Sequence, residues 1–228
     1  YPRQPNDVKD MQQLRRCIDG YDCGIRFMDE HIGMILDKLA TQGILDDTAI
    51  IVTSDHGENF GELGVYSEHG TADDITCRIP MIIKWPAGKR GHVDSGFHYN
   101  IDLAPTMAEL LGASAWDKWD GRSYAASLTS GDDTGRDGLI LSQGCHVCQR
   151  SVRWDNWLYM RTYHDGFHPH FGEEMLFDIA ADPHETADLA EARPEVLAEG
   201  QKRLAAWHDE MMRSMPFGHT TDPMDSVL

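Results

Sequence analysis

The sequence has little positive charge and no long apolar segment. Its 20 lysine and arginine residues stand against 38 aspartate and glutamate residues, which gives a formal net charge of −18. Binding to nucleic acid or to anionic lipid requires a basic surface, so this balance argues against both partners. No run approaches the roughly 18 apolar residues that indicate a membrane-spanning helix. The chain of 228 residues is long enough to bury one sizeable core.

Cysteine is scarce, and its pattern argues against a disulfide framework. The sequence has five cysteines, an odd number and a low density for a chain of this size. Cys145 and Cys148 have CxxC spacing, but a structural zinc site needs four ligands and no second CxxC pair is present. Two buried thiols in a strand turn are the simpler interpretation. The unpaired count leans toward a reducing, cytoplasmic compartment.

The sequence does contain a short β-branched run that leads into polar residues. Ile50, Ile51 and Val52 suit a strand that is buried on both faces of a sheet. Asp55 and His56 follow, and in open α/β sheets ligands collect just beyond the carboxyl ends of the strands. A carboxylate oxygen beside an imidazole nitrogen can form half of a divalent-metal site. From this dipeptide alone, a polar strand-to-loop turn is the favoured interpretation.

The remaining pattern predicts α/β architecture over residues 1–137. Apolar residues recur at steps of three and four from Asn6 to about Thr41, which predicts one long helix that Asn6 caps and Gly43 ends. Residues 57–70 are expected to form a polar, glycine-rich loop. A second buried strand is expected at 81–83, a helix at 101–111 and a surface connection over 113–137.

From residue 138 the pattern changes to short strands and one last helix. Asp155 and Asn156 form a turn signal between two aromatic-rich segments, which predicts a hairpin. Further strands are expected at 139–141 and 175–178, followed by a helix over 194–212. We expect residues 138–228 to form a small C-terminal α+β subdomain with an antiparallel sheet and a C-terminal helix.

Several segments, taken together and in this order, carry a family resemblance. They are the helix with Tyr21, Asp29 and Ile32-Gly33; residues 43–58 with Ser54-Asp55-His56-Gly57-Glu58; Arg78-Ile79-Pro80; Asp102-Leu103-Ala104-Pro105-Thr106; and residues 175–190 with Asp182-Pro183-His184-Glu185. The chain resembles the C-terminal half of a sulfatase, in the alkaline phosphatase-like superfamily. The resemblance implies part of a sulfatase-type α/β sandwich for residues 1–137, followed by the small subdomain.

The resemblance assigns two metal ligands, Asp55 and His56. Sulfatases often carry Asn at the second of these positions, and an amide oxygen suits calcium. The imidazole nitrogen of His56 suits manganese or zinc better. We therefore expect a divalent metal, with calcium from the family likeness and manganese or zinc as the alternative. His56 is also able to turn away and hydrogen-bond to the substrate.

A second assignment from the resemblance is His69. Related enzymes place a Lys or His in this loop, where it contacts the transferred group or protonates the leaving oxygen. We expect His69 to serve as a catalytic and substrate-binding residue; a solvent-exposed histidine beside Glu68 is the alternative. Glu58 is a candidate for orienting His56, with a solvated carboxylate as the alternative. The histidines at 164, 168 and 170 are candidates for the rim of the pocket, with a polar hairpin loop as the default interpretation.

One departure from the family concerns the nucleophile. In sulfatases, a Cys or Ser in a Cys/Ser-x-Pro-x-Arg motif becomes formylglycine, but none of the five cysteines here has Pro two residues later and Arg four residues later. The upstream Asp pair of the family is not found either. The opening Tyr1–Pro5 reads as a loop and not as a signal peptide. We expect a fragment that is inactive alone and whose apolar surface is covered by a missing N-terminal half or by self-association.

Three functions are compatible with these residues. The first is a metal-dependent sulfatase, a sulfuric ester hydrolase that acts on small-molecule sulfate esters. The second is a phosphonate monoester or phosphodiester hydrolase of the same superfamily, because related hydrolases of this kind carry the His variant found at His56. The third is a non-catalytic domain derived from a sulfatase.

Overall fold

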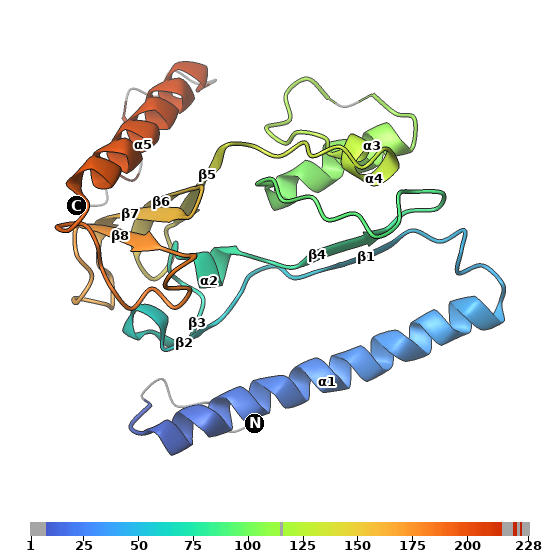
Figure 1. The fold of residues 1–228 in the computed structure, drawn as a ribbon, viewed down its shortest axis with the longest axis horizontal. Helices are drawn as coiled ribbons and strands as arrows, with labels where there is room; N and C mark the ends of the chain where they lie inside the picture. Colours follow the sequence, from blue (N-terminus) through green and yellow to red (C-terminus); the bar gives the residue numbers. More distant parts are fainter. Residues whose placement is uncertain (1–7, 115, 216–220, 223, 225–228) are drawn as a thin grey trace. The chain divides into compact units, whose positions relative to one another are not determined.

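A computed structural model describes residues 8–114, 116–215, 221, 222 and 224 (Figure 1). Contacts divide the chain into two compact units: Tyr1–Ser54 with Pro80–Gly135, and Asp55–Ile79 with Arg136–Leu228. The chain thus contributes residues 55–79 to the second unit before it returns to the first. The domain boundary between residues 137 and 138 stays a prediction. Among the described helices, none is long and apolar enough to cross a bilayer.

The first unit begins with one long helix, α1 (Met11–Thr41). Asp10 caps it by accepting a hydrogen bond from the Gln13 N–H at 2.7 Å. Gly43, at φ +72°, supplies the left-handed residue just beyond its end. The predicted helix is therefore confirmed as a single element, whose cap is Asp10; the predicted cap, Asn6, lies outside the described residues.

Two strands of the first unit pair antiparallel, β1 (Ile50–Thr53) and β4 (Met81–Lys84). Both were expected to be buried, and this expectation is wrong for the described chain, in which Val52 is 36% exposed and Ile82 65% exposed. Helix α1 also exposes apolar side chains, which include Tyr21, Ile25, Met28 and Ile35. Covering of this apolar surface by the rest of the protein or by a second copy stays a prediction.

The predicted helix after residue 100 is confirmed, and the connection that follows it contains an unexpected one. A single turn of 3₁₀ helix, η2 (Asn100–Asp102), leads into α3 (Leu103–Leu110). The connection predicted over 113–137 includes helix α4 (Ala125–Thr129). The Tyr124 N–H donates to the Thr106 hydroxyl at 3.0 Å, and this contact anchors α4 to α3. A five-residue helix has no sequence periodicity that would reveal it.

The second unit is built on a four-stranded antiparallel sheet in the order β5-β6-β7-β8. Helix α5 follows the last of these strands in the chain. The predicted hairpin is confirmed: Trp154 pairs with Trp157 across a turn in which Asp155 has φ +42°. The bounds are β5 (Gly138–Gln143), β6 (Cys148–Trp154), β7 (Trp157–His164), β8 (Glu174–Asp178) and α5 (Pro194–Ser214).

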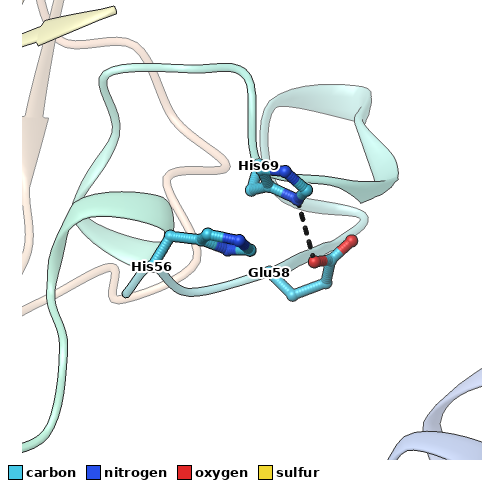
Figure 2. Close-up of side chains that lie close together, drawn as sticks. All are labelled: His56, Glu58 and His69. Atoms are coloured by element: carbon cyan, nitrogen blue, oxygen red, sulfur yellow. Dashed lines mark hydrogen bonds and ion pairs between the residues drawn. The ribbon is translucent and has the colours of Figure 1, made fainter. Parts of the chain in front are cut away.

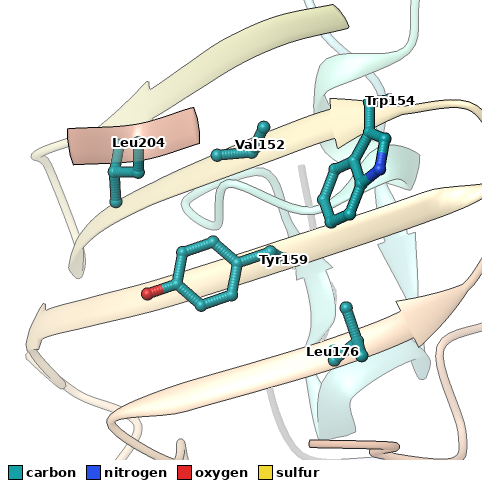
Figure 3. Close-up of a cluster of buried hydrophobic side chains, with 5 residues drawn as sticks. All are labelled: Val152, Trp154, Tyr159, Leu176 and Leu204. Atoms are coloured by element: carbon teal, nitrogen blue, oxygen red, sulfur yellow. The ribbon is translucent and has the colours of Figure 1, made fainter. Parts of the chain in front are cut away.

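One face of this sheet packs against α5. Figure 3 shows the buried side chains of that interface, Val152, Trp154, Tyr159, Leu176 and Leu204. The helix comes unusually close to β7 because Gly200 has no side chain: a Cβ there would lie 2.5 Å from the Cβ of Tyr159. The close approach buries Tyr159 completely.

The opposite face of the sheet carries a second buried cluster, and the segment 55–79 supplies a residue to it. Leu158, Met160 and Phe177 lie in this cluster, and Leu63 packs against it. The expected loop over 57–70 is in part wrong, because it holds a short hairpin and a 3₁₀ turn. Its elements, with the helix that follows, are β2 (Asn59–Phe60), η1 (Glu62–Gly64), β3 (Tyr66–Glu68) and α2 (Asp74–Cys77).

Candidate active site

A buried hydrogen-bond network fixes the segment that carries the candidate residues. The Asp73 carboxylate accepts hydrogen bonds from the Asn59 amide at 2.5 Å and from the Thr71 hydroxyl and the Thr76 N–H, each at 3.1 Å. The Thr76 hydroxyl in turn donates to the Asn59 side chain at 2.5 Å. These four residues are buried, so satisfying their polar groups internally ties the two ends of the segment together.

A glycine is required where the chain turns after His56. The Gly57 N–H donates to the Thr76 carbonyl at 2.8 Å. A Cβ on Gly57 would lie 1.9 Å from the carbonyl oxygen of Ile75, so no other residue fits without movement of the backbone. The local fold therefore requires glycine at position 57, whatever the chemical role of Asp55 and His56.

Asp55 and His56 lie close to each other and are open to solvent. The His56 Nε2 lies 3.7 Å from the Asp55 Oδ2, and the Asp55 side chain is 88% exposed. The His56 Nδ1 donates to the Gly57 carbonyl at 2.8 Å, which leaves Nε2 with its lone pair on the side of Asp55. The backbone N–H groups of Asp55 and His56, and then the His56 ring, hold the pKa of Asp55 below its ordinary value. The pair therefore offers one carboxylate and one imidazole nitrogen to a cation.

His69 lies directly against His56 although thirteen positions separate them in the sequence. The two rings stack with centroids 3.7 Å apart and planes 18° apart. The His69 Nδ1 donates to the Glu58 carboxylate at 3.2 Å, and Figure 2 shows this contact and the His56 ring beside it. Ligand atoms of His56, Glu58 and His69 all lie within 4.8 Å of one another, so this group could also hold a cation.

The structure brings the predicted residues together and changes the role of one neighbour. Asp55, His56 and His69, all named from the sequence, lie in this one region. Glu58 was a candidate for orienting His56, but in the structure it bonds to His69 instead. Sequence reasoning missed that pairing because the β2–β3 hairpin, which returns residue 69 to residue 58, has only a weak local signal.

The other histidine candidates make separate contacts within the second unit. His168 lies 3.3 Å from the Glu68 carboxylate, and His170 donates to the Leu63 carbonyl at 2.7 Å. His164 accepts a hydrogen bond from the Gly166 N–H at 2.9 Å. Their placement at the rim of a substrate pocket stays a prediction. The CxxC thiols of Cys145 and Cys148 are both free, and neither belongs to a group of potential metal ligands among the described residues.

A buried carboxyl next to this network titrates far from its ordinary range. Glu185 accepts a hydrogen bond from the Asp74 N–H at 2.9 Å. Burial, and then the negative charge of Asp73, raise the pKa of Glu185 from an ordinary value of 4.5 to about 9. The carboxyl group is therefore protonated at neutral pH in the folded chain and ionised in the unfolded chain.

We expect the free energy of unfolding to fall as pH rises because of Glu185. From about pH 4.5 to about pH 9 the folded state holds one more proton than the unfolded state, so stability declines with a slope of up to about 1.4 kcal/mol per pH unit. Glu185→Gln cannot titrate and should flatten that decline in urea unfolding between about pH 5 and 8. Glu191→Gln, at an exposed position, should leave the slope as it is. An unchanged slope in the Glu185→Gln variant would contradict the assignment.

Comparison with known proteins gives one family and a consistent set of relatives. The family model described as Sulfatase matches residues 1–113. A choline-sulfatase from Rhizobium meliloti (strain 1021) is 28% identical over 188 residues, which cover 79% of this chain and 34% of the relative. The chain spans about a third of the length of the curated relatives it matches (34%, 38% and 32% for three of them).

Solved structures agree with the sequence comparison. A 2-O GAG sulfatase superposes with a TM-score of 0.75 at 21% identity, covering 90% of this chain and 45% of that one. A phosphonate monoester hydrolase from Silicibacter pomeroyi superposes with a TM-score of 0.65 at 26% identity, covering 83% and 40%. The first likeness concerns the fold alone. The second is a likeness to a protein described as a phosphonate monoester hydrolase.

Proposed function

Because this chain belongs to the sulfatase family, with its alkaline phosphatase-like α/β fold, we propose that the protein containing it hydrolyses sulfate esters with a divalent metal. The observation that carries the proposal is the group formed by Asp55, His56, Glu58 and His69. These side chains come from a short segment and lie together at the surface of the second unit. The substrate would be a small molecule that carries a sulfate ester.

Asp55 and His56 would hold the metal. A metal-bound histidine usually donates its other ring N–H to a carbonyl or carboxylate, and the His56 Nδ1 donates to the Gly57 carbonyl. The nitrogen that remains faces the ionised carboxylate of Asp55. When bound, the cation would stabilise negative charge on the sulfuryl oxygens. Calcium follows from the family likeness, but one nitrogen and one oxygen donor favour manganese or zinc.

His69 would act on the leaving oxygen, and Glu58 would position it. The Glu58 carboxylate fixes the His69 ring through Nδ1, which leaves Nε2 to carry a proton to a substrate oxygen. The stacked His56 ring limits rotation of His69 from the other side. Formylglycine, the nucleophile of the family, would come from a part of the protein outside this chain, since no cysteine here lies in the required motif.

A second function keeps the site and changes the transferred group. The phosphonate monoester hydrolase among the structural relatives has 26% identity to this chain, so a phosphonate monoester or phosphodiester substrate is the alternative. Sulfuryl and phosphoryl groups both present anionic oxygens to a metal and a general acid, so this site by itself favours neither.

The test compares the full-length protein with this chain on an aryl sulfate and an aryl phosphonate monoester. We expect metal-dependent turnover of the sulfate by the full-length protein, loss of turnover with EDTA, and no turnover by this chain alone. Turnover by the chain alone would contradict an external nucleophile. Preference for the phosphonate would select the second function. No turnover of either substrate by the metal-loaded full-length protein would favour a non-catalytic domain.

A further inference from the structure

We propose a second divalent-cation site in the first unit, formed by His92, Asp94, His98 and Asp133. It lies in the unit formed by residues 1–54 and 80–135, whereas the candidate active site lies in the other unit. The proposal does not depend on the proposed function. It rests on the distances within this group, on two buried nitrogens and on the way two loops are joined.

The ligand atoms have the spacing of a small coordination sphere. The His98 Nε2 lies 3.1 Å from the Asp94 Oδ2, and the His92 Nε2 lies 3.5 Å from the Asp133 Oδ1. Ligand atoms of His92, Asp94 and Asp133 all lie within 4.8 Å of one another. Two ligands on a tetrahedral zinc ion, each about 2.1 Å from it, are about 3.4 Å apart. The two close pairs therefore have the spacing of neighbouring ligands on one ion.

The two imidazole nitrogens that face the carboxylates are buried and make no hydrogen bond. Within the described part of the chain, the Nε2 atoms of His92 and His98 have no hydrogen-bond partner and almost no exposure to solvent. Each lies near a carboxylate oxygen without the alignment that a hydrogen bond needs. A cation between nitrogen and oxygen would satisfy both, since both would direct lone pairs at it.

Two loops far apart in the sequence are joined tightly at this point. A Cβ on Gly96 would lie 2.4 Å from the Cα of Gly135, so the backbones touch directly. Asp94 bridges the loops, accepting hydrogen bonds from the Gly96 N–H at 2.9 Å and the Thr134 N–H at 3.5 Å. The contact holds Asp94 and His98 of the first loop opposite Asp133 of the second.

The donor set indicates the class of cation. Two imidazole nitrogens and two carboxylate oxygens suit zinc or manganese, whereas calcium prefers six or more oxygen ligands. The charge of a dication would balance the two carboxylates. Behind His98, the buried Asp102 carboxylate lies 4.0 Å from the ring Nδ1, on the side away from Asp94. At 4.0 Å this carboxylate is beyond hydrogen-bond distance, so it adds negative charge near the site and does not fix the ring.

Zinc binding by this chain tests the site. The test uses the chain with His56→Ala and His69→Ala, which lacks both imidazole ligands of the candidate active site. We expect this chain to bind one equivalent of Zn²⁺ in competition with a chromophoric chelator. In that background, His92→Ala, His98→Ala or Asp133→Asn should each weaken binding at least about tenfold. Co²⁺ should give the visible absorption of a four-coordinate ion, and Asp133→Asn should lower that absorption at a Co²⁺ concentration that saturates only the unsubstituted site.

The controls separate a bound metal from a simple ion-pair cluster. Asp117→Asn, at an exposed carboxylate outside the group, should leave Zn²⁺ affinity unchanged. The Asp133 side chain is 57% exposed, so its replacement tests the site even if the histidine variants fail to fold. No Zn²⁺ bound in the His56→Ala, His69→Ala background would overturn the proposal. Equal Zn²⁺ affinity in the Asp133→Asn and Asp117→Asn chains would overturn it too.

Discussion

Replacing His69 with alanine in the full-length protein is expected to lower kcat for an aryl sulfate about 10²–10⁴-fold, the usual contribution of general acid–base catalysis. The His69 ring is held between the Glu58 carboxylate and the stacked His56 ring, so its removal deletes a positioned proton donor. Steady-state kinetics at saturating metal would measure the loss. KM should change much less than kcat, because the contact matters most in the transition state.

The matched control for this prediction is His31→Ala. His31 lies on α1, is exposed, and hydrogen-bonds through its ring to the Phe27 carbonyl of the same helix. Its removal should leave kcat within a factor of about two. Glu58→Gln should lower kcat less than His69→Ala does and should shift the pH profile, as expected for a residue that acts through His69. If His69→Ala and His31→Ala gave equal rates, His69 would have no catalytic role.

Replacing Gly200 with leucine should destabilise the second unit by about 3 kcal/mol or more, a large part of the stability of an ordinary domain. The reason is steric: a Cβ at this position would lie 2.5 Å from the Tyr159 Cβ and 2.6 Å from its Cγ. Helix α5 would have to move off the sheet and expose Leu204 and Tyr159, which are both buried at that interface. Urea unfolding followed by tryptophan fluorescence would measure the change.

Gly24→Leu provides the control for this steric argument. Gly24 lies inside α1, and a Cβ there would meet no atom within 4 Å. Leucine is the better helix former, by somewhat less than the roughly 0.8–1 kcal/mol that separates glycine from alanine, so this variant should be neutral or slightly stabilising. A loss of stability of similar size at both positions would show that the effect at Gly200 comes from the leucine itself and not from its contact with Tyr159.

Elements with strong local signals could be predicted from the sequence. The periodic apolar residues of α1 and the Asp155-Asn156 turn between two aromatic strands each depend on neighbours a few positions away. Helix α4 and the β2–β3 hairpin were missed because they are short and depend on contacts with distant residues, such as that of Thr106 with Tyr124. Burial of β1 and β4 was wrong because an apolar run shows only that a strand is able to be buried.

The same division holds at the candidate site. Asp55 and His56 are adjacent in the chain, so their proximity follows from the sequence alone. His69 was named through the family resemblance, and nothing local predicts that its ring stacks on His56. The hydrogen bond from His69 to Glu58 depends on the return of the chain through β2 and β3, which the buried Asn59–Asp73 contact fixes. The sequence alone therefore does not predict this hydrogen bond.

The packing of Leu63 against the cluster that contains Phe177 has a consequence for how this protein can be shortened. A truncated version that starts at residue 138 would keep all four strands of the sheet and helix α5. It would lose the segment 55–79, and with it Leu63 and the groups that bond to Arg153 and Gln149, which are Asp74 and the Ala72 N–H. We infer that the candidate histidines and this face of the sheet depend on one another, so excision of the C-terminal region would give an aggregation-prone, half-covered sheet and not a free-standing module.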